Sequence, residues 1–577
     1  MHLQNTARST TSGSQFCWCY MKKYVLTILI PLLLYGGCNF RKFESLPKNM
    51  LVTSVISDPR TFNPILANET SSTDVLDPVF AGLTRLNPMT FQVEPGLARS
   101  WTISSNRRVI TMHLRKDVYF SDGKPFSAHD VVFTFKVFYS PNVLSSYRDL
   151  FTIKGRQIKV EALNDHTVRF ILPVPFYPFL ESLNIPILPA HVLEKPLQEN
   201  LFERTWNIIT PPSQIVGLGP YTIASYVPSQ YIMLRANPFY FGKDAAGVRL
   251  PYIKNRALLI VQNQDAQYVK FISGETDIYD PRPQEVSLLE SMSKRRHFTV
   301  RNIGLDTGIM FVSFNRNPRH YIKNGIVNPK YRWFTNPDFL KAVAHSIDKQ
   351  AIIDDVYRGY GEPAVSFIPR NVPVYHLNMP DYAYNLGEAR DLLKKGGFHW
   401  RDGKLYDRHD NRVEFDFFTN SGNEQRERIA AIILTDLTKL GMKVNYKPLD
   451  FNTLVEKLTT NFDWDCMLIA LTGGYEPYNA ANVLLSSGML HLWDPSEKKP
   501  ATAWEAEIDR LMTRGAEEYN IQKRAIYFKK IQLILHDELP LIPLVRQEDF
   551  VAYTDRLEDY RPTVFGNYRP EMMRLKQ

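Results

Sequence analysis

Cysteine is scarce in this chain, which contains four in 577 residues. Cys17, Cys19 and Cys38 all lie near the N-terminus, so Cys466 is the one cysteine in the rest of the sequence. A single thiol excludes an internal disulfide framework there. Because Cys466 lies in the apolar segment 463–471, which is typical of a buried strand, we expect it to pack as a small hydrophobic residue.

Long hydrophobic runs and clustered positive charge are also missing. The apolar segment 24–35 has about half the length that a membrane-spanning helix needs. Lys and Arg number 69 and are scattered among 60 Asp and Glu, which gives a net charge of +9 without a basic stripe. Nucleic-acid binding needs such a stripe or patch, so we expect no nucleic-acid partner. The excess charge indicates a solvated surface or, alternatively, proximity to an anionic membrane.

The sequence shows no catalytic or metal-binding pattern. His and Cys residues do not stand at the spacing of a zinc site. Ser127, His129 and Asp130 lie too close together on one predicted helical turn to assemble a catalytic triad. We therefore predict no catalytic residue, no metal, no cofactor and no enzymatic activity.

The N-terminal region resembles a bacterial lipoprotein signal. Lys22-Lys23 precede the apolar segment 24–35, and Gly36-Gly37-Cys38 follows it, as at a cleavage site. We predict a signal peptide at 21–37 and lipid attachment at Cys38.

Two further segments surround this signal. Residues 1–20 fit no signal pattern, and we interpret them as an upstream non-native start or a disordered segment. Residues 38–50 are polar and basic, which predicts a tether to the membrane. The protein is then expected in the bacterial cell envelope, in the periplasm or on the outer face of the cytoplasmic membrane, held by a lipid anchor.

The segment 114–135, LRKDVYFSDGKPFSAHDVVFTF, organises the rest of the chain. Alternating apolar residues at 110–114 predict a half-buried strand. Gly and Pro within 121–125 supply turn chemistry. Ser127 suits the N-cap of the following helix, and Asp130 suits its first turn, where a carboxylate meets free backbone N–H groups.

This segment resembles the signature of the family 5 extracellular solute-binding proteins, which are the receptor components of peptide, nickel and related ABC importers. Further segments match the family in the same order over about 51–549, namely 58–64, 94–101, 187–191, 216–221, 271–277 and 334–369. The resemblance implies an α/β fold like that of the type II periplasmic binding proteins. Such a fold has two main lobes around a hinge, here with an additional domain.

A chain of 577 residues is expected to contain roughly two to four structural units. We predict a discontinuous lobe I, an additional domain and a lobe II, with the bounds 51–75 plus 195–300 plus 540–577, 76–194, and 301–539. The partners that the resemblance implies are a small-molecule or oligopeptide ligand and the permease and ATPase subunits of an ABC importer. We expect a monomer.

Two loops are predicted to line the ligand cavity. In the family, the first of them corresponds to Asn68, Glu69 and Thr70, although Ser or Thr here also suits plain helix capping. The second loop follows the predicted strand 463–471 and carries the flanking residue Asn479. Asn420, Asn423 and Asn479 are candidate neutral hydrogen-bonding residues.

The second loop contains Gly473, Gly474, Tyr475 and Glu476. Peptide-binding relatives often place an Asp just before the Glu-Pro or Asp-Pro of this loop, where it pairs with the amino group of the ligand. Two glycines occupy that stretch here, so either Glu476 takes over or the ligand has no free amine at this point. Alternatively, the glycines only form a tight turn after the strand.

These features predict a protein that captures a peptide-like or other small polar solute by hinge closure and delivers it to an ABC importer. A cavity that excludes water and a few placed polar groups are sufficient for that task. Two readings from other classes stay open. One is an envelope sensor or adaptor that uses the same fold without transport, and the other is a hydrolase, which the missing catalytic pattern disfavours.

Overall fold

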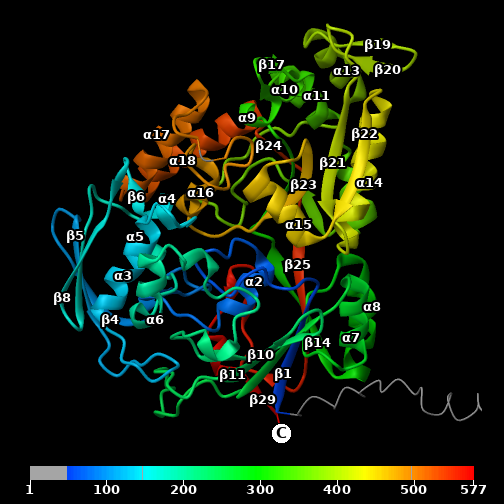
Figure 1. Cartoon of the computed structure of the whole chain (residues 1–577). Coiled ribbons are helices and arrows are strands. Elements are labelled where there is room, and N and C mark those ends of the chain that lie inside the picture. The colour runs from blue at the N-terminus through cyan, green and yellow to red at the C-terminus, as the bar shows by residue number, and fades with distance from the viewer. Residues whose placement is uncertain (1–48, 146, 496, 577) are drawn as a thin grey trace, which may run out of the picture. The chain divides into compact units, whose positions relative to one another are not determined.

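The computed structural model describes residues 49–145, 147–495 and 497–576 (Figure 1). Residues 1–20, the predicted signal peptide, the predicted lipid-attachment residue Cys38 and the tether up to residue 48 lie outside the described residues. Within the described residues, no helix combines the length and the apolar character needed to cross a membrane.

One four-stranded sheet contains the first described strand. Its order is β1 (Met50–Val55), β12 (Asn255–Ile260), β11 (Tyr231–Ala236) and β10 (Tyr221–Val227). Strand β1 is parallel to β12, and the other neighbours are antiparallel. Alternating or continuous apolar residues in β1 and β11 are typical of such half-buried strands.

Helix α2 (Thr70–Leu76) follows β1 and is short, ending two residues before Pro78. Pro78 has no N–H and cannot continue the helical hydrogen bonds, which explains the early end. The N-cap position is occupied by Glu69 rather than by Ser or Thr. The Ser72 hydroxyl donates a hydrogen bond to the Glu69 carboxylate.

The segment that organises the sequence forms the predicted strand, turn and helix. Strand β5 (Val109–Leu114) alternates between buried and half-buried residues. Ser127 caps α3 (Ala128–Tyr139) in a capping box, in which the Ser127 N–H donates to Asp130 Oδ2 at 2.8 Å. Strand β5 lies in an antiparallel sheet with the order β4 (Ala98–Ile103), β5, β9 (Thr167–Ile171) and β8 (Lys159–Asn164).

A five-stranded sheet contains the four longest strands that lie wholly within predicted lobe II, together with β24 from beyond its end. Strand β21 is parallel to both of its neighbours, and β15 is antiparallel to both of its own. Cys466 opens the central strand and is buried as a free thiol, as expected. The strand order is β22 (Lys443–Leu449), β21 (Glu414–Asn420), β23 (Cys466–Leu471), β15 (Ile309–Phe314) and β24 (Leu541–Pro543).

Helices surround this sheet. Asn336 caps one of them, with Pro337 in its first turn. The helical segment from Lys349 to Val356 divides into α12 and one π-helical turn, Ile352–Val356. The helices are α10 (Pro329–Phe334), α11 (Pro337–Ser346), α12 (Lys349–Ala351), α13 (Leu386–Lys395), α14 (Glu424–Lys439) and α15 (Phe451–Glu456). Helix α16 (Ala481–Leu484) instead contributes its buried residues to the core around α3.

Shorter elements connect the larger ones. The short helices are α4 (Tyr147–Phe151), α5 (Phe179–Ser182), α6 (Ala190–Gln198) and α9 (Pro318–Tyr321). Two-stranded pairs join β2 (Thr84–Leu86) to β3 (Val93–Pro95), β6 (Thr152–Ile153) to β7 (Arg156–Gln157), β16 (Ile322–Lys323) to β17 (Ile326–Val327), and β19 (His399–Arg401) to β20 (Lys404–Tyr406). Near the C-terminus, β26 (Leu557–Glu558) pairs with β29 (Arg574–Leu575), and β27 (Pro562–Thr563) with β28 (Gly566–Asn567).

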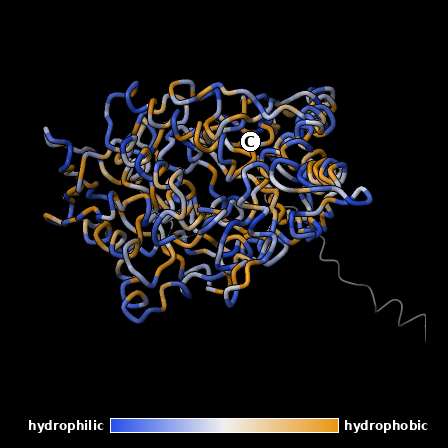
Figure 2. The backbone as a smooth tube through the Cα atoms, turned by 90° about the horizontal axis from the view of Figure 1, so that it is seen from above, coloured by the Kyte–Doolittle hydropathy of each residue, from blue (hydrophilic) through white to orange (hydrophobic). Residues whose placement is uncertain are grey.

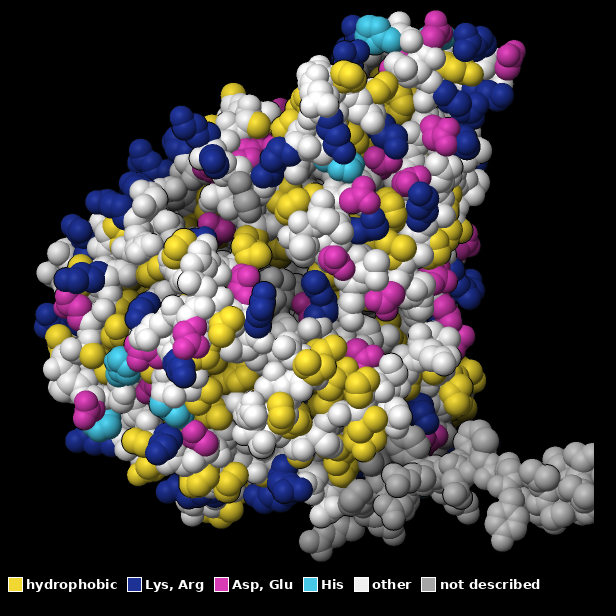
Figure 3. All heavy atoms as spheres, in the orientation of Figure 1, with side chains coloured by type: hydrophobic (Ala, Val, Ile, Leu, Met, Phe, Trp, Pro, Cys, Tyr) yellow, Lys and Arg dark blue, Asp and Glu magenta, His cyan; other side chains and the backbone are white. Residues whose placement is uncertain are grey.

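The hydrophobic core around α3 continues into two long helices from the end of predicted lobe II. These helices, α17 (Ala503–Glu517) and α18 (Ile521–Glu538), contribute to the same buried cluster as Phe135. A second cluster lies around the five-stranded sheet. Figure 2 shows many of the hydrophilic stretches in loops at the edge of the view. On the face that Figure 3 shows, Lys and Arg are interspersed with Asp and Glu.

A further sheet combines strands from distant parts of the chain. Strand β25 (Val545–Thr554) pairs with β13 (Ile278–Tyr279), β14 (Phe298–Leu305) and β18 (Gly361–Pro363). Helices α7 (Gln264–Ile272) and α8 (Pro283–Arg296) flank β13 in the sequence.

Two neighbouring chain segments connect this sheet to the five-stranded sheet. Strand β14 leads into β15 through residues 306–308, and β24 leads into β25 through Leu544. The Leu544 N–H donates to the Met310 carbonyl at 2.9 Å, and the Asp306 N–H donates to the Gln547 carbonyl at 2.9 Å. The two crossings therefore lie side by side. The domain bounds stay a prediction, and β24, which those bounds assign to lobe I, pairs with β15.

Candidate functional site

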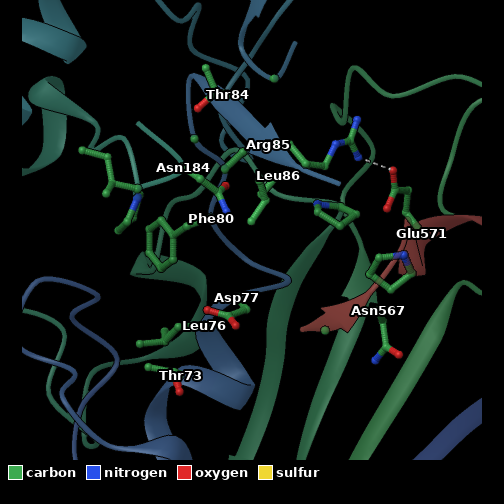
Figure 4. Close-up of a pocket in the computed structure, with 18 of the residues that line it drawn as sticks. Thr73, Leu76, Asp77, Phe80, Thr84, Arg85, Leu86, Asn184, Asn567 and Glu571 are labelled. Carbon is green, nitrogen blue, oxygen red and sulfur yellow. Dashed lines mark hydrogen bonds and ion pairs between the residues drawn. The ribbon is translucent and has the colours of Figure 1, made fainter. Parts of the chain in front are cut away.

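A cavity of about 470 Å³ lies beside helix α2 and the C-terminal segment. Figure 4 shows Thr73, Asp77 and Phe80 on one part of its wall and Asn567 and Glu571 on another. Its lining mixes aromatic and aliphatic groups with a few polar ones, and its size falls within the range of small-molecule sites.

Two carboxylates of α2 and its C-cap face poorly solvated space. Burial raises the pKa of Asp74 to about 7, and the charges of Asp77 and Asp280 raise it further. Burial also raises the pKa of Asp77, which lines the cavity, to about 6. Both side chains nevertheless retain solvent-accessible surface.

Three more carboxylates come from the β25 sheet and the crossings. Burial raises the pKa of Asp280, directly after β13, to about 6. Burial and the charges of Asp306 and Asp280 raise the pKa of Asp549, on β25, to about 7. Because the charge of Asp280 acts on both Asp74 and Asp549, it links the carboxylates of α2 to those near the crossings.

We call Asp74, Asp280, Asp306 and Asp549 the acidic wall. In the part of the chain that the structure describes, no ion pair joins these four carboxylates to Lys or Arg. Asp306 accepts a hydrogen bond from the Gly308 N–H, and Asp549 accepts one from the Gln547 side chain at 2.8 Å. The charge of Arg256 lowers the pKa of Asp74, and that of Arg546 lowers the pKa of Asp306, but neither arginine forms an ion pair with these carboxylates, so their negative charge is only partly compensated.

A cation lies near one end of the acidic wall. Burial lowers the pKa of Arg426, on α14, to about 10. Its guanidinium donates to the Asn420 side chain, and its backbone N–H donates to Asn423 Oδ1 at 2.9 Å. The charges of Arg426, Asp306 and Asp549 all act on the pKa of Tyr357, so the three surround that ring. Two sequence-predicted asparagines thus position an arginine that sequence reasoning missed.

The first predicted loop leads directly into α2, the helix that carries Asp74 of the acidic wall. Glu69 is buried at the N-cap of α2, and its Oε2 accepts a hydrogen bond from the Asn68 N–H at 3.1 Å. Thr70 is the first residue of α2 and is exposed. Four residues later the same helix carries Asp74. Whether Asn68, Glu69 or Thr70 contacts a ligand stays a prediction.

In the second loop, Glu476 is already paired. Its carboxylate lies 2.9 Å from Arg524 Nη1, and its Oε1 accepts from the Tyr478 N–H at 2.8 Å. Both side chains are almost completely buried, with exposed fractions of 1% for Glu476 and 0% for Arg524. Arg524 also donates to the Gly515 carbonyl at 2.7 Å. The pair therefore fastens the second loop to α17 and α18, and its role as an amine anchor stays a prediction.

Tyr475 and Asn479 reach residues of the predicted additional domain. The Tyr475 ring stacks on Phe91 with centroids 4.0 Å apart and also contacts Phe565, which lines the cavity. Asn479 donates to Glu181 at 3.3 Å. Burial and the charge of Glu476 raise the pKa of Glu181 to about 8.

The two glycines of the second loop differ sharply. A Cβ added to Gly473 would lie 1.8 Å from the Thr307 carbonyl oxygen, within the crossing between β14 and β15. A Cβ on Gly474 would meet nothing within 4 Å. Close backbone approach therefore explains Gly473, which is consistent with the tight-turn reading.

Sequence reasoning missed the acidic wall. Asp74, Asp280, Asp306 and Asp549 come from four elements and share no spacing or motif. The one local signal is Asp280, a carboxylate that directly follows the apolar strand residues Ile278 and Tyr279.

Comparisons with known proteins agree on one family. The model of the bacterial extracellular solute-binding proteins, family 5, matches residues 92–488, which is well over half of the chain. A "Probable ABC transporter-binding protein" of Deinococcus radiodurans is 28% identical over 87% of this chain and 88% of its own. "Heme-binding protein A" of Haemophilus influenzae is 26% identical over 91% and 92%.

Solved structures show the same fold. The oligopeptide-binding protein AppA of Bacillus subtilis, in complex with a nonapeptide, aligns with a TM-score of 0.78 at 23% identity, over 91% of this chain and 99% of its own. NikZ of Campylobacter jejuni, in complex with Ni(L-His), aligns with a TM-score of 0.75 at 22% identity, over 92% and 100%. The predicted α/β fold of the type II periplasmic binding protein kind is thereby confirmed, and the chain belongs to the bacterial extracellular solute-binding proteins of family 5.

Proposed function

We propose that this chain is the substrate-binding protein of an ABC importer and that its cargo is a small, peptide-like solute with a positively charged group. The observation that carries the proposal is the acidic wall, whose carboxylates retain accessible surface and form no ion pair with Lys or Arg among the described residues. Holding several unpaired carboxylates in poorly solvated space is unfavourable. An ammonium group of the solute would compensate their charge.

Arg426 supports a solute that also carries an anionic group. Its guanidinium is buried and is bonded to the neutral Asn420 side chain. Arginine recognises carboxylates with two parallel hydrogen bonds. A zwitterion with its ammonium at the acidic wall and its carboxylate at Arg426 would satisfy both parts of the site.

Capture would proceed by closure around the two side-by-side crossings. Contacts between the predicted lobes support a closed state. Arg282, on α8's N-cap, forms an ion pair with Glu424 of α14, and Asn452 donates to the Asp58 carbonyl at 3.2 Å. A solute that contacts both lobes binds the closed form better and shifts the population toward it.

We infer that the protein changes no bond in its cargo. The polar groups of the site are carboxylates, an arginine and amides, which are sufficient for recognition. Covalent labelling of the purified protein by a serine- or cysteine-directed probe would instead support a hydrolase. Normal solute uptake after deletion of the gene would favour the envelope sensor or adaptor.

The cellular setting belongs to the same proposal. A signal peptide at 21–37 and a lipid on Cys38 would hold the monomeric protein at the cell envelope, near its permease and ATPase partners. Mass spectrometry of the mature N-terminus tests the lipid, and light scattering of the purified protein tests the monomer.

Native mass spectrometry of protein from its own host would identify retained cargo. Calorimetry then compares the tripeptide Ala-Lys-Ala with its N-acetylated form and with Ala-Glu-Ala. We expect the free, cationic peptide to bind about 10- to 100-fold more tightly, because a charge-assisted hydrogen bond contributes about 1.5–3 kcal/mol. Equal affinity for all three peptides, or a retained anionic cargo, would contradict the proposal.

A further inference from the structure

A separate group of side chains lies between α16 and α17. One ligand atom from each of His491, Glu497 and Glu505 lies within 4.8 Å of the other two. Glu505 belongs to the first turn of α17, and the other two precede that helix. The group shares no residue with the acidic wall or with the 470 Å³ cavity.

The orientation of His491 is fixed. The ring is completely buried, and its Nδ1 lies 2.9 Å from the Val483 carbonyl oxygen. A carbonyl only accepts hydrogen bonds, so Nδ1 carries the proton and Nε2 of the neutral ring carries a lone pair. Among the described residues, Nε2 has no hydrogen-bond partner, and it lies 3.6 Å from Glu505 Oε1.

Both carboxylates are also held by neighbouring donors. Glu497 Oε2 accepts from the Ala501 N–H at 2.9 Å, which leaves Oε1 without a hydrogen-bond partner among the described residues. Glu505 Oε2 accepts from the Thr502 N–H at 2.8 Å, and its Oε1 accepts from Trp493 Nε1 at 3.0 Å. Outer hydrogen bonds of this kind orient metal ligands.

The surrounding charges are mixed. Asp494 and Asp509 add negative charge near the cluster, and Arg316 and Arg319 add positive charge. Arg319 is engaged by Asp494 at 3.0 Å, and Arg316 donates to the Glu538 carbonyl at 3.2 Å. Both arginines therefore have other partners, although Arg316 Nε has no hydrogen-bond partner among the described residues. His491 Nε2 lies 3.6 Å from Glu505 Oε1.

We propose that His491, Glu497 and Glu505 bind a divalent metal ion of the zinc class. One imidazole nitrogen and two carboxylate oxygens are ligands that Zn²⁺ accepts. Bonds of about 2.0–2.1 Å in a tetrahedral site place neighbouring ligand atoms roughly 3.3 Å apart, close to the 3.6 Å between His491 Nε2 and Glu505 Oε1. The two carboxylates also line a pocket of about 110 Å³, which offers an entry path and room for a water as fourth ligand.

The site would tie the segment before α17 to that helix. It lies in the structure independently of the cargo site, so it does not depend on the proposed function. Neither spacing nor motif identifies it in the sequence, because the three residues follow no standard zinc pattern.

The test uses full-length, tag-free protein that has been treated with a chelator and dialysed. Zn²⁺ is titrated by calorimetry, and Co²⁺ is added to record visible absorption. We expect about one equivalent to bind, intense Co²⁺ bands typical of fourfold coordination, and a higher melting temperature with metal. Glu497→Gln and His491→Gln should each weaken binding by at least about tenfold.

His376→Gln is the matched control, since His376 Nδ1 also lies 2.8 Å from a backbone carbonyl, that of Ile368, but has no carboxylate cluster. Glu497→Gln keeps an oxygen that can accept from the Ala501 N–H, so it remains informative if His491→Gln does not fold. Absence of stoichiometric binding by the unaltered chain, or equal affinity in Glu497→Gln and the control, would overturn the proposal.

Discussion

Two groups of charged side chains in this molecule differ in burial and in pairing. The Glu476–Arg524 pair is excluded from solvent and fully bonded. The acidic wall retains accessible surface, holds raised pKa values and has no ion pair among the described residues. A charge that the protein compensates itself serves the fold, whereas a charge left uncompensated in accessible space is available to a ligand.

Breaking the Glu476–Arg524 pair should have the largest effect on stability. Glu476→Gln leaves a buried guanidinium without its counter-charge, which typically costs about 3–5 kcal/mol. The free energy of unfolding, measured with urea, checks this value. The control is Glu507→Gln, which removes an exposed pair with Arg510 and should cause little change.

The cargo affinity of a folded Glu476 variant sharpens the same comparison. If the pair is only structural, affinity for the cargo should be unchanged once the protein is fully folded. A specific loss of affinity would instead identify Glu476 as the amine anchor that the sequence suggests.

Removing charge from the acidic wall should lower cargo affinity without lowering stability, which is the reverse of the pattern expected for Glu476. The double variant Asp280→Asn with Asp549→Asn should bind a cationic cargo with about 10- to 100-fold lower affinity, because a charge-assisted contact is lost. The ligand-free protein should not become less stable, since the mutual repulsion of the wall falls. Calorimetry and urea unfolding check both outcomes, and Asp391→Asn, at an exposed pair with Lys394, is the control.

The glycines of the second loop provide a smaller test. Gly473→Ala should destabilise the protein by about 1–3 kcal/mol, because its Cβ overlaps the Thr307 carbonyl at the crossing. Gly474→Ala has open space around its Cβ and should change stability by less than about 0.5 kcal/mol. Similar stability of the two variants in urea would contradict the close approach at Gly473.

The pH dependence of the ligand-free protein should be the smallest effect. The pKa values of Asp74 and Asp549 are raised to about 7 in the folded state, so the folded protein binds more protons than the unfolded chain between about pH 4 and 7. Stability from these groups therefore falls as pH rises through that window. Cargo affinity should rise in the same window, and Asp280→Asn with Asp549→Asn should flatten both melting and binding profiles.

Local sequence was sufficient for much of the fold. The strand and capped helix around Ser127 and Asp130 could be predicted because apolar period, turn chemistry and capping all act within a few residues. The end of α2 could also have been read from Pro78.

The site depends on long-range pairing that leaves no local pattern. Asp280 and Asp549 become neighbours because β13 pairs with β25, whose residues are more than 250 positions apart. The partner of Glu476 likewise lies 48 positions away, on α18. Sequence could therefore identify the second loop but not whether its carboxylate was free.

Arg282 forms an asymmetric set of ion pairs between the two predicted lobes. It contacts Asp265 and Glu285 on its own side of the molecule and Glu424 across from it. If the predicted lobes separate, Arg282 keeps its ion pairs with two carboxylates, and Glu424 becomes solvated. Opening therefore leaves no charge at this point buried without a partner. The grip on a cargo is then set by the cargo itself, and a permease that draws the lobes apart has only one such contact at Arg282 to break.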